Sequence, residues 1–264
     1  MNIGFLIEKG FNLYKEIEPY LSSTQKAILN KIFSNFEVVN SCTELDKYNE
    51  ARIILRSAIE SAVLFCYISK YPEKESEYIQ DCELMEFKKH LISYKEYLRN
   101  KEIPELQETI KNIDEQKLIS ENENFFRILS KENQYKILSI IKEKEYKLTL
   151  QTFNKLDKYY EKKFRPFFTK LEKMYKALEN FTPDIKFHMR ELFFRDYNIY
   201  SQLAHGNFLS WNSKINKLDK LEIISTIKRI LFIPYLILKN KQIMVSEATL
   251  KELSTAIDII EQSI

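Results

Sequence analysis

The amino-acid sequence predicts an all-α fold, a multi-helix bundle. Apolar residues recur at spacings of three and four along most of the 264 residues, which is the periodicity of amphipathic helices. The chain has only three glycines and six prolines, too few for the closely spaced turns of hairpins and β-sandwiches. Its length suits one elaborated helical domain or two small ones, and we expect a single domain over residues 1–264.

In chain order, the pattern predicts helices at about 2–19, 24–38, 45–70, 75–99, 104–117, 122–180 with a break near Pro166, 183–205, 217–239 and 246–263. The stretch of about 84–180 is more charged than its flanks. We interpret it as a long helical insertion between two core helices, 45–70 and 183–205. Residues 217–264 form a C-terminal helical pair.

The first core helix is apolar on nearly every side from Ala51 to Ile68, so it must be largely buried. Three charged residues interrupt it at intervals of four: Arg52, Arg56 and Glu60. Burying an ion is costly unless it is paired. Either Arg56 and Glu60 neutralise each other on a face that borders solvent, or Glu60 orients Arg56 in a cleft where its planar guanidinium binds an anion.

The second core helix places Tyr197, Ser201 and His205 on one stripe. A helix C-terminus favours the charged imidazole, which makes His205 a candidate for proton transfer near neutral pH. The alternative is a core histidine bonded to a neighbouring hydroxyl or carbonyl group. The ends of the helix carry residues typical of those positions, with Thr182, Pro183 and Asp184 at its start and Gly206 at its end.

Lysines alternate with aromatic residues between Lys155 and Lys170, a pattern that can bind a nucleic-acid backbone and stack on bases. The alternative is an amphipathic helix with buried aromatics and solvated lysines. The net charge of +3 gives little long-range attraction for polyanions.

The sequence predicts neither a metal site nor an organic cofactor. Cys42, Cys66 and Cys82 are widely spaced and resemble reduced cytosolic thiols, and His90 and His188 lack a convincing set of further ligands. There is no signal-peptide pattern, and the apolar run Ile230–Leu238 is too short to span a bilayer. We expect a cytoplasmic protein with no membrane association.

Three motifs together resemble a bacterial family of uncharacterised all-helical proteins near the HEPN superfamily, the higher-eukaryote and prokaryote nucleotide-binding domains. They are Arg-Ser-x-x-Glu at residues 56–60, the acidic and hydrophobic segment 78–84, and Tyr-x-x-x-Ser-x-x-x-His-Gly at residues 197–206. The resemblance covers roughly residues 45–210 and implies a HEPN-like core. Many HEPN domains are metal-independent ribonucleases of toxin–antitoxin and phage-defence systems. Their hallmark is an arginine separated from a histidine by four to six residues on one helix, whereas nine residues separate Arg195 from His205, so Arg56 of the neighbouring helix must supply the arginine.

The resemblance therefore implies a metal-independent ribonuclease or RNA-targeting toxin of a bacterial defence system. We expect helix 45–70 to pack against helix 183–205, bringing Arg56 or Glu60 close to Ser201, Tyr197 or His205. The candidate catalytic residues are His205, Arg56, Ser201 and Glu60, and the candidate substrate-binding residues are Arg52, Tyr197, Tyr200 and Asn198. One alternative is a non-catalytic sensor module that binds a nucleotide or a protein; another is that the polar stripes only lock two core helices together.

The expected partners are RNA or a nucleotide, a second copy of the chain, and an antitoxin or other defence-system protein. A homodimer is expected because HEPN-like ribonucleases commonly build their site across a two-fold axis. The candidate dimer surfaces are apolar, and both could instead complete the core of the monomer. They are the run Ile230–Leu238 and the positions Leu250, Leu253, Ile257 and Ile260 of the last helix.

Overall fold

A computed structural model of the chain describes residues 3–83, 85–86, 96, 131, 174–176, 183–204, 217–240 and 246–262. These residues form helices and the short connections between them, with no strand, so the predicted all-α fold is confirmed. The chain divides into two compact units, residues 1–72 with 170–264 and residues 73–169. In the second unit, residues 75–83 are helical. Most of the expected insertion at 84–180 lies outside the described residues, and the single-domain interpretation stays a prediction.

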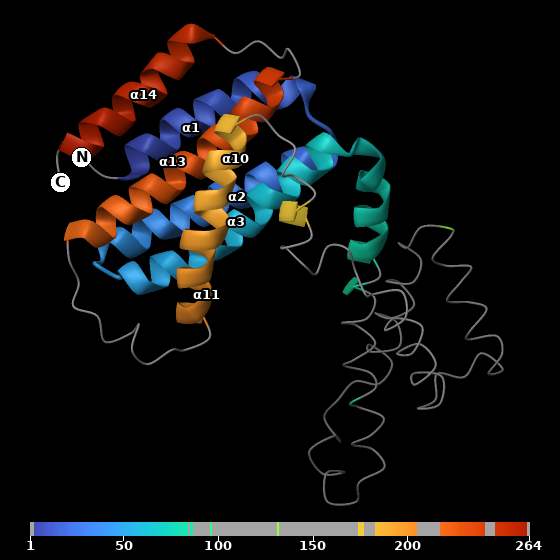
Figure 1. Ribbon diagram of the computed structural model, residues 1–264, viewed down its shortest axis with the longest axis horizontal. Helices are drawn as coiled ribbons and strands as arrows, with labels where there is room; N and C mark the ends of the chain where they lie inside the picture. The colour runs from blue at the N-terminus through green and yellow to red at the C-terminus, as the bar shows by residue number, and fades with distance from the viewer. Residues whose placement is uncertain are drawn as a thin grey trace, which may run out of the picture. The chain divides into compact units, whose positions relative to one another are not determined.

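The first unit is a helical bundle (Figure 1). Its described α-helices are α1 (Ile3–Ile17), α2 (Ser23–Glu44), α3 (Tyr48–Lys70), α10 (Pro183–Arg190), α11 (Asn198–Ala204), α13 (Lys217–Asn240) and α14 (Glu247–Gln262). A π-helix, η5 (Glu191–Tyr197), joins α10 to α11, and short 3₁₀ helices cover Glu18–Tyr20 and Pro72–Lys74. For the helices of this unit that the structure describes, the predicted boundaries agree to within a few residues, except that α2 continues six residues beyond its predicted end at 38.

Helix α3 is the centre of the bundle. It packs against α2, α13, α11 and η5, which explains why its sequence is apolar on nearly every side. Leu55, Ile59, Val63 and Phe65 are fully buried. The predicted contact between helices 45–70 and 183–205 is therefore confirmed, since α11 and η5 lie directly on α3.

A capping box begins α2 and also ties it to α3. The Gln25 amide N–H donates to Ser22 Oγ over 3.2 Å, and the Gln25 side chain accepts from the Ser22 amide over 3.0 Å. The same Gln25 side chain donates to Ser69 Oγ over 2.8 Å, in the interior. One glutamine thus satisfies a helix terminus and holds the start of α2 against the end of α3.

The C-terminal helix docks on α1 through a carboxylate. Glu16 accepts hydrogen bonds from the amide and hydroxyl of Ser246, each over 2.9 Å, and from the Thr249 hydroxyl. Leu253 on α14 and Ile230 and Leu231 on α13 are buried within the unit. These members of the two candidate dimer surfaces therefore complete the core of the monomer, which is the alternative that the sequence left open.

Glu16 gives the docking of α14 a pH dependence. Burial raises the pKa of its carboxyl, but the hydrogen bonds from Thr249 and Ser246 outweigh this effect and lower the pKa below its ordinary value of 4.5. A depressed folded-state pKa stabilises the fold above pH 4.5, and this stabilisation is lost as the pH falls through the folded-state pKa.

We predict that Glu16→Gln lowers the free energy of unfolding at pH 7 by about 1 kcal/mol, and that the difference from wild type shrinks as the pH falls below 4.5. Urea unfolding across this pH range measures both effects. The matched control is Glu252→Gln, which breaks only the exposed ion pair of Glu252 with Lys9 and should cost less than about 0.5 kcal/mol. A difference that is the same at every pH would contradict the account.

Candidate anion-binding site

Arg56, Glu60 and Tyr197 meet where η5 crosses α3. The Tyr197 hydroxyl donates to Glu60 Oε1 over 3.2 Å, and Arg56 Cζ lies 5.4 Å from the centre of the Tyr197 ring. These contacts confirm the predicted proximity of the charged stripe on α3 to the Tyr197 stripe. They also provide both electrostatic partners that a half-buried guanidinium favours, a carboxylate and an aromatic face.

The guanidinium of Arg56 is held on one side only. Its Nε lies 3.3 Å from Glu60 Oε1 as an i,i+4 ion pair, and the two side chains are 26% and 43% exposed. The predicted neutralisation of Arg56 by Glu60 on a face that borders solvent is therefore present. Within the described part of the chain, neither Nη atom of Arg56 has a hydrogen-bond or ion-pair partner. The outer edge of the guanidinium thus keeps donors that an oxyanion could accept from.

Arg52, one turn earlier on α3, differs from Arg56 because it is buried and its Nη2 atom is paired. Its side chain is buried, and its Nη2 donates to Asp219 Oδ1 over 2.6 Å and to Glu222 Oε2 over 2.7 Å. Burial lowers the pKa of Arg52, but the hydrogen bonds to Glu222 and Asp219 outweigh it, and the pKa is raised. Arg52 therefore joins α3 to α13 as a buried ion pair.

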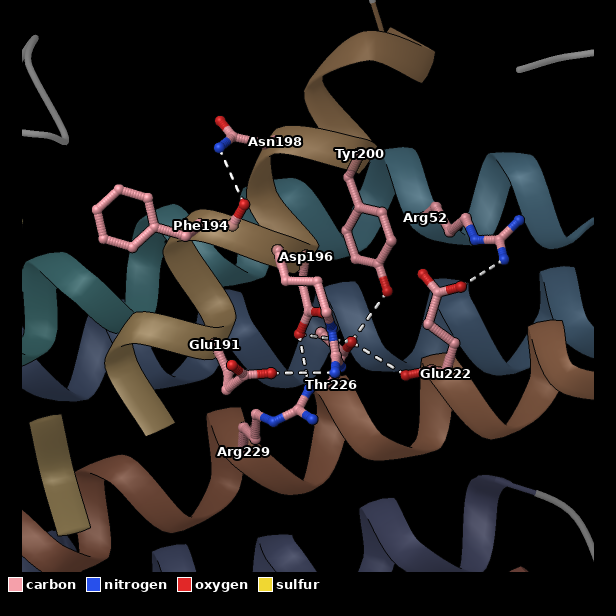
Figure 2. A network of polar contacts seen from close by, with 10 residues as sticks. Arg52, Glu191, Phe194, Asp196, Asn198, Tyr200, Glu222, Thr226 and Arg229 are labelled. Atoms are coloured by element: carbon pink, nitrogen blue, oxygen red, sulfur yellow. Dashed lines mark hydrogen bonds and ion pairs between the residues drawn. The ribbon is translucent and has the colours of Figure 1, made fainter. Parts of the chain in front are cut away.

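A buried carboxylate lies at the centre of a second polar network (Figure 2). Asp196, in η5, is fully buried. Its Oδ1 accepts from Arg195 Nε over 2.9 Å, and its Oδ2 accepts from Arg229 Nη1 over 2.9 Å and from Thr226 Oγ1 over 3.0 Å. Burial raises the pKa of this carboxyl in spite of the opposing effect of Arg229 and Arg195. The network ties η5 to α13.

Tyr200 belongs to the same network. Its hydroxyl lies 2.9 Å from Thr226 Oγ1, within the interior. Because Thr226 donates its single hydroxyl proton to Asp196 Oδ2, Tyr200 is the donor to Thr226. Burial raises the pKa of Tyr200 well above its ordinary value, which keeps it protonated as this role requires. Tyr200 therefore connects α11 to α13.

The remaining candidate residues are placed as follows. Ser201 is half-buried and has no hydrogen bond within the residues described, and Asn198 is exposed and donates to the Phe194 carbonyl over 3.0 Å. Pro183 begins α10, as predicted. His205, the caps Thr182 and Gly206, and the basic aromatic stretch 155–170 lie outside the described residues.

The sequence interpretation overlooked the residues of α13 that build these networks. Asp219, Glu222, Thr226 and Arg229 follow one another at spacings of three, four and three, so they form a polar stripe on a helix that is otherwise largely apolar. This stripe is the signal that could have identified them. No such signal marks the π-helix, since residues 184–205 contain neither glycine nor proline.

The chain belongs to a family of unknown function, DUF5677, which its sequence matches over residues 27–221. This span includes α3, η5 and α11, and thus the whole contact of Arg56 with Glu60 and Tyr197. No curated protein and no solved structure matches the chain.

Within the described ranges, no helix is long and apolar enough to cross a membrane. In the same ranges, His, Cys, Asp and Glu side chains nowhere gather in a group of three that could bind a metal ion.

The Asp196 network predicts losses of unfolding free energy that differ in size among three substitutions. Asp196→Asn should lower the free energy of unfolding by about 3–5 kcal/mol, because it leaves Arg229 without its buried counter-ion, while Arg195 keeps its ion pair with Glu191. Tyr200→Phe should cost about 1 kcal/mol, since it removes one hydrogen bond and keeps the ring. Asn198→Ala, on the exposed side of the same helix, should change it by less than about 0.5 kcal/mol. Urea unfolding at pH 7 measures all three, and an Asp196→Asn protein as stable as wild type would refute this role.

Proposed function

We propose that the protein is a metal-independent endoribonuclease, acting as an RNA-targeting toxin in phage defence or a toxin–antitoxin system. One observation carries the proposal: Arg56 is fixed by Glu60 and Tyr197, yet its Nη atoms have no partner within the described chain. A positioned guanidinium with open donors suits a phosphodiester, which accepts a two-pronged contact. The resemblance to HEPN-like proteins supplies the reaction class.

In the proposed reaction, the RNA 2′-oxygen attacks the adjacent phosphorus and the bond from phosphorus to the 5′-oxygen breaks. The products are a 2′,3′-cyclic phosphate and a 5′-hydroxyl end. His205 takes the proton of the 2′-hydroxyl or gives one to the leaving 5′-oxygen, and Arg56 stabilises charge on the phosphoryl oxygens. Ser201, one turn before His205, orients the imidazole or bonds the phosphate. No step needs an activated water or a metal ion.

The other candidate residues take supporting roles in this proposal. Glu60 and Tyr197 fix the Arg56 guanidinium through the contacts described above. Arg52 and Tyr200 are engaged in buried networks, so we assign them to positioning of α3 and α11 on α13 and not to substrate contact. Asn198, which is exposed, remains a candidate contact for the RNA.

The proposal extends to assembly. Each chain supplies only one candidate catalytic histidine, His205. We therefore propose that two copies of the chain form a dimer in which each contributes to cleavage. An antitoxin or another defence protein is a further proposed partner. Light scattering at tens of micromolar, with and without RNA, tests the dimer. A monomer under both conditions would contradict it.

We predict that His205→Ala and Arg56→Ala each reduce RNA cleavage by about 10²–10⁴-fold, without loss of the helical circular dichroism signal. Arg56→Lys should also lose RNA cleavage, because a point charge does not reproduce a two-pronged contact. EDTA should have no effect, and mass spectrometry of the products should find 2′,3′-cyclic phosphate ends.

Arg52→Lys is the matched control. It alters an arginine of the same stripe that is already paired, so it should reduce stability and leave cleavage per folded molecule nearly unchanged. If purified protein leaves a broad panel of RNAs intact while His205→Ala still abolishes toxicity in cells, the site is a sensor and not an enzyme. If His205→Ala only lowers the melting temperature, the residue is structural.

A further inference from the structure

The helix formed by α10 and η5 presents two exposed phenylalanines. Phe187 is 61% exposed and Phe194 is 55% exposed. Single exposed apolar residues are common on protein surfaces, so exposure alone says little. The charges beside these two rings distinguish this surface.

Two exposed cations of this helix lack an acidic partner among the described residues. Lys186 and Arg190 are exposed and have no ion pair within the described residues. The described acidic side chains of η5 are already engaged, since Glu191 pairs with Arg195 at 3.0 Å and Asp196 is buried between Arg195 and Arg229. Exposed aromatic rings beside unpaired cations have the chemistry that stacks bases and contacts phosphates.

Phe194 packs against two neighbouring rings. It makes edge-to-face contacts with Tyr175 and Phe193, with ring centres 5.3 Å apart in each case. The Asn198 side chain donates to the Phe194 carbonyl, and both side chains point away from the Asp196 network (Figure 2). A ring that already packs against its neighbours loses less conformational entropy when a base stacks on it.

A continuous series of ring contacts connects Phe194 to the anion-binding site. Phe193, which touches Phe194, stacks on Tyr197 with ring centres 5.7 Å apart and planes 7° apart. The Arg56 guanidinium lies over the Tyr197 ring. The exposed ring and the Arg56 guanidinium therefore belong to one continuous aromatic cluster.

We infer that the outer surface of α10 and η5, formed by Lys186, Phe187, Arg190 and Phe194, binds single-stranded RNA, with a base next to the scissile phosphate stacked on Phe194. This inference rests on the proposed function and names its substrate class. Stacking on Phe194 requires an unpaired base, because the bases of a duplex are stacked on one another. Two cations alone give weak electrostatic binding, so stacking contributes much of the affinity.

The test is fluorescence anisotropy with a labelled 15-nucleotide 2′-O-methyl oligouridine, which has no 2′-hydroxyl to attack. Phe194→Ala should weaken binding by roughly 5- to 150-fold, and Phe194→Trp should retain it, because tryptophan keeps a stacking surface. Ile199→Ala is the control, since Ile199 is a non-aromatic exposed residue of α11. Replacing Lys186 and Arg190 with glutamine should reduce the slope of log affinity against log salt by about 1.4.

Two outcomes would overturn the inference. One is that Phe194→Ala binds as tightly as wild type while the Ile199→Ala control behaves normally. The other is that Phe194→Ala weakens binding to a 2′-O-methyl duplex by the same factor. Cleavage of unmodified RNA is measured separately: cleavage without dependence of binding on Phe194 rejects this surface alone, whereas Phe194-dependent binding without cleavage rejects the ribonuclease and supports the surface.

Discussion

The arrangement of the bundle around the candidate site depends on one buried carboxylate. Asp196 is fully buried, and its two oxygens accept from Arg195, Arg229 and Thr226. Removing a charge from water costs several kcal/mol, and only complete hydrogen bonding of both oxygens makes the burial tolerable. This requirement fixes η5 against α13. It also sets the rotation of the η5 helix, so that Tyr197, the next residue in the chain, contacts Glu60 on α3.

The charged stripe on α3 contains two arginines, Arg52 and Arg56, which differ in their surroundings. Arg52 faces α13, where Asp219 and Glu222 are within 2.7 Å and leave its Nη2 fully engaged. Arg56, four residues later, faces Tyr197 and Glu60, which hold one edge and one face of its guanidinium. The two ion pairs of Arg52 fix α3 on α13, whereas Arg56, whose Nη atoms have no partner within the described residues, can still bind an anion. This difference is the physical basis for assigning structure to Arg52 and ligand binding to Arg56.

Much of the fold could be predicted because its signals are local. Apolar periodicity located the described helices, and the cost of buried charge predicted that α3 and the helix of Tyr197 would meet at Arg56 and Glu60. The partners of Arg52 lie about 170 residues along the chain, and no local pattern on α3 selects them. The π-helix has no glycine or proline to mark it, although it carries the buried Asp196. Tyr200 likewise gave no local sign of its buried role, because its partner Thr226 lies on α13.

The central claim is that Arg56, and not Arg52, is the open anion-binding group. Nuclear magnetic resonance of the arginine side-chain nitrogens, during titration with a 2′-O-methyl uridine dinucleotide, tests it most directly. The account predicts that the Arg56 Nη resonances shift and saturate, while those of Arg52 stay unchanged because Asp219 and Glu222 already occupy its Nη2. Unchanged Arg56 resonances at high dinucleotide concentration, or equal shifts at Arg52, would contradict the account.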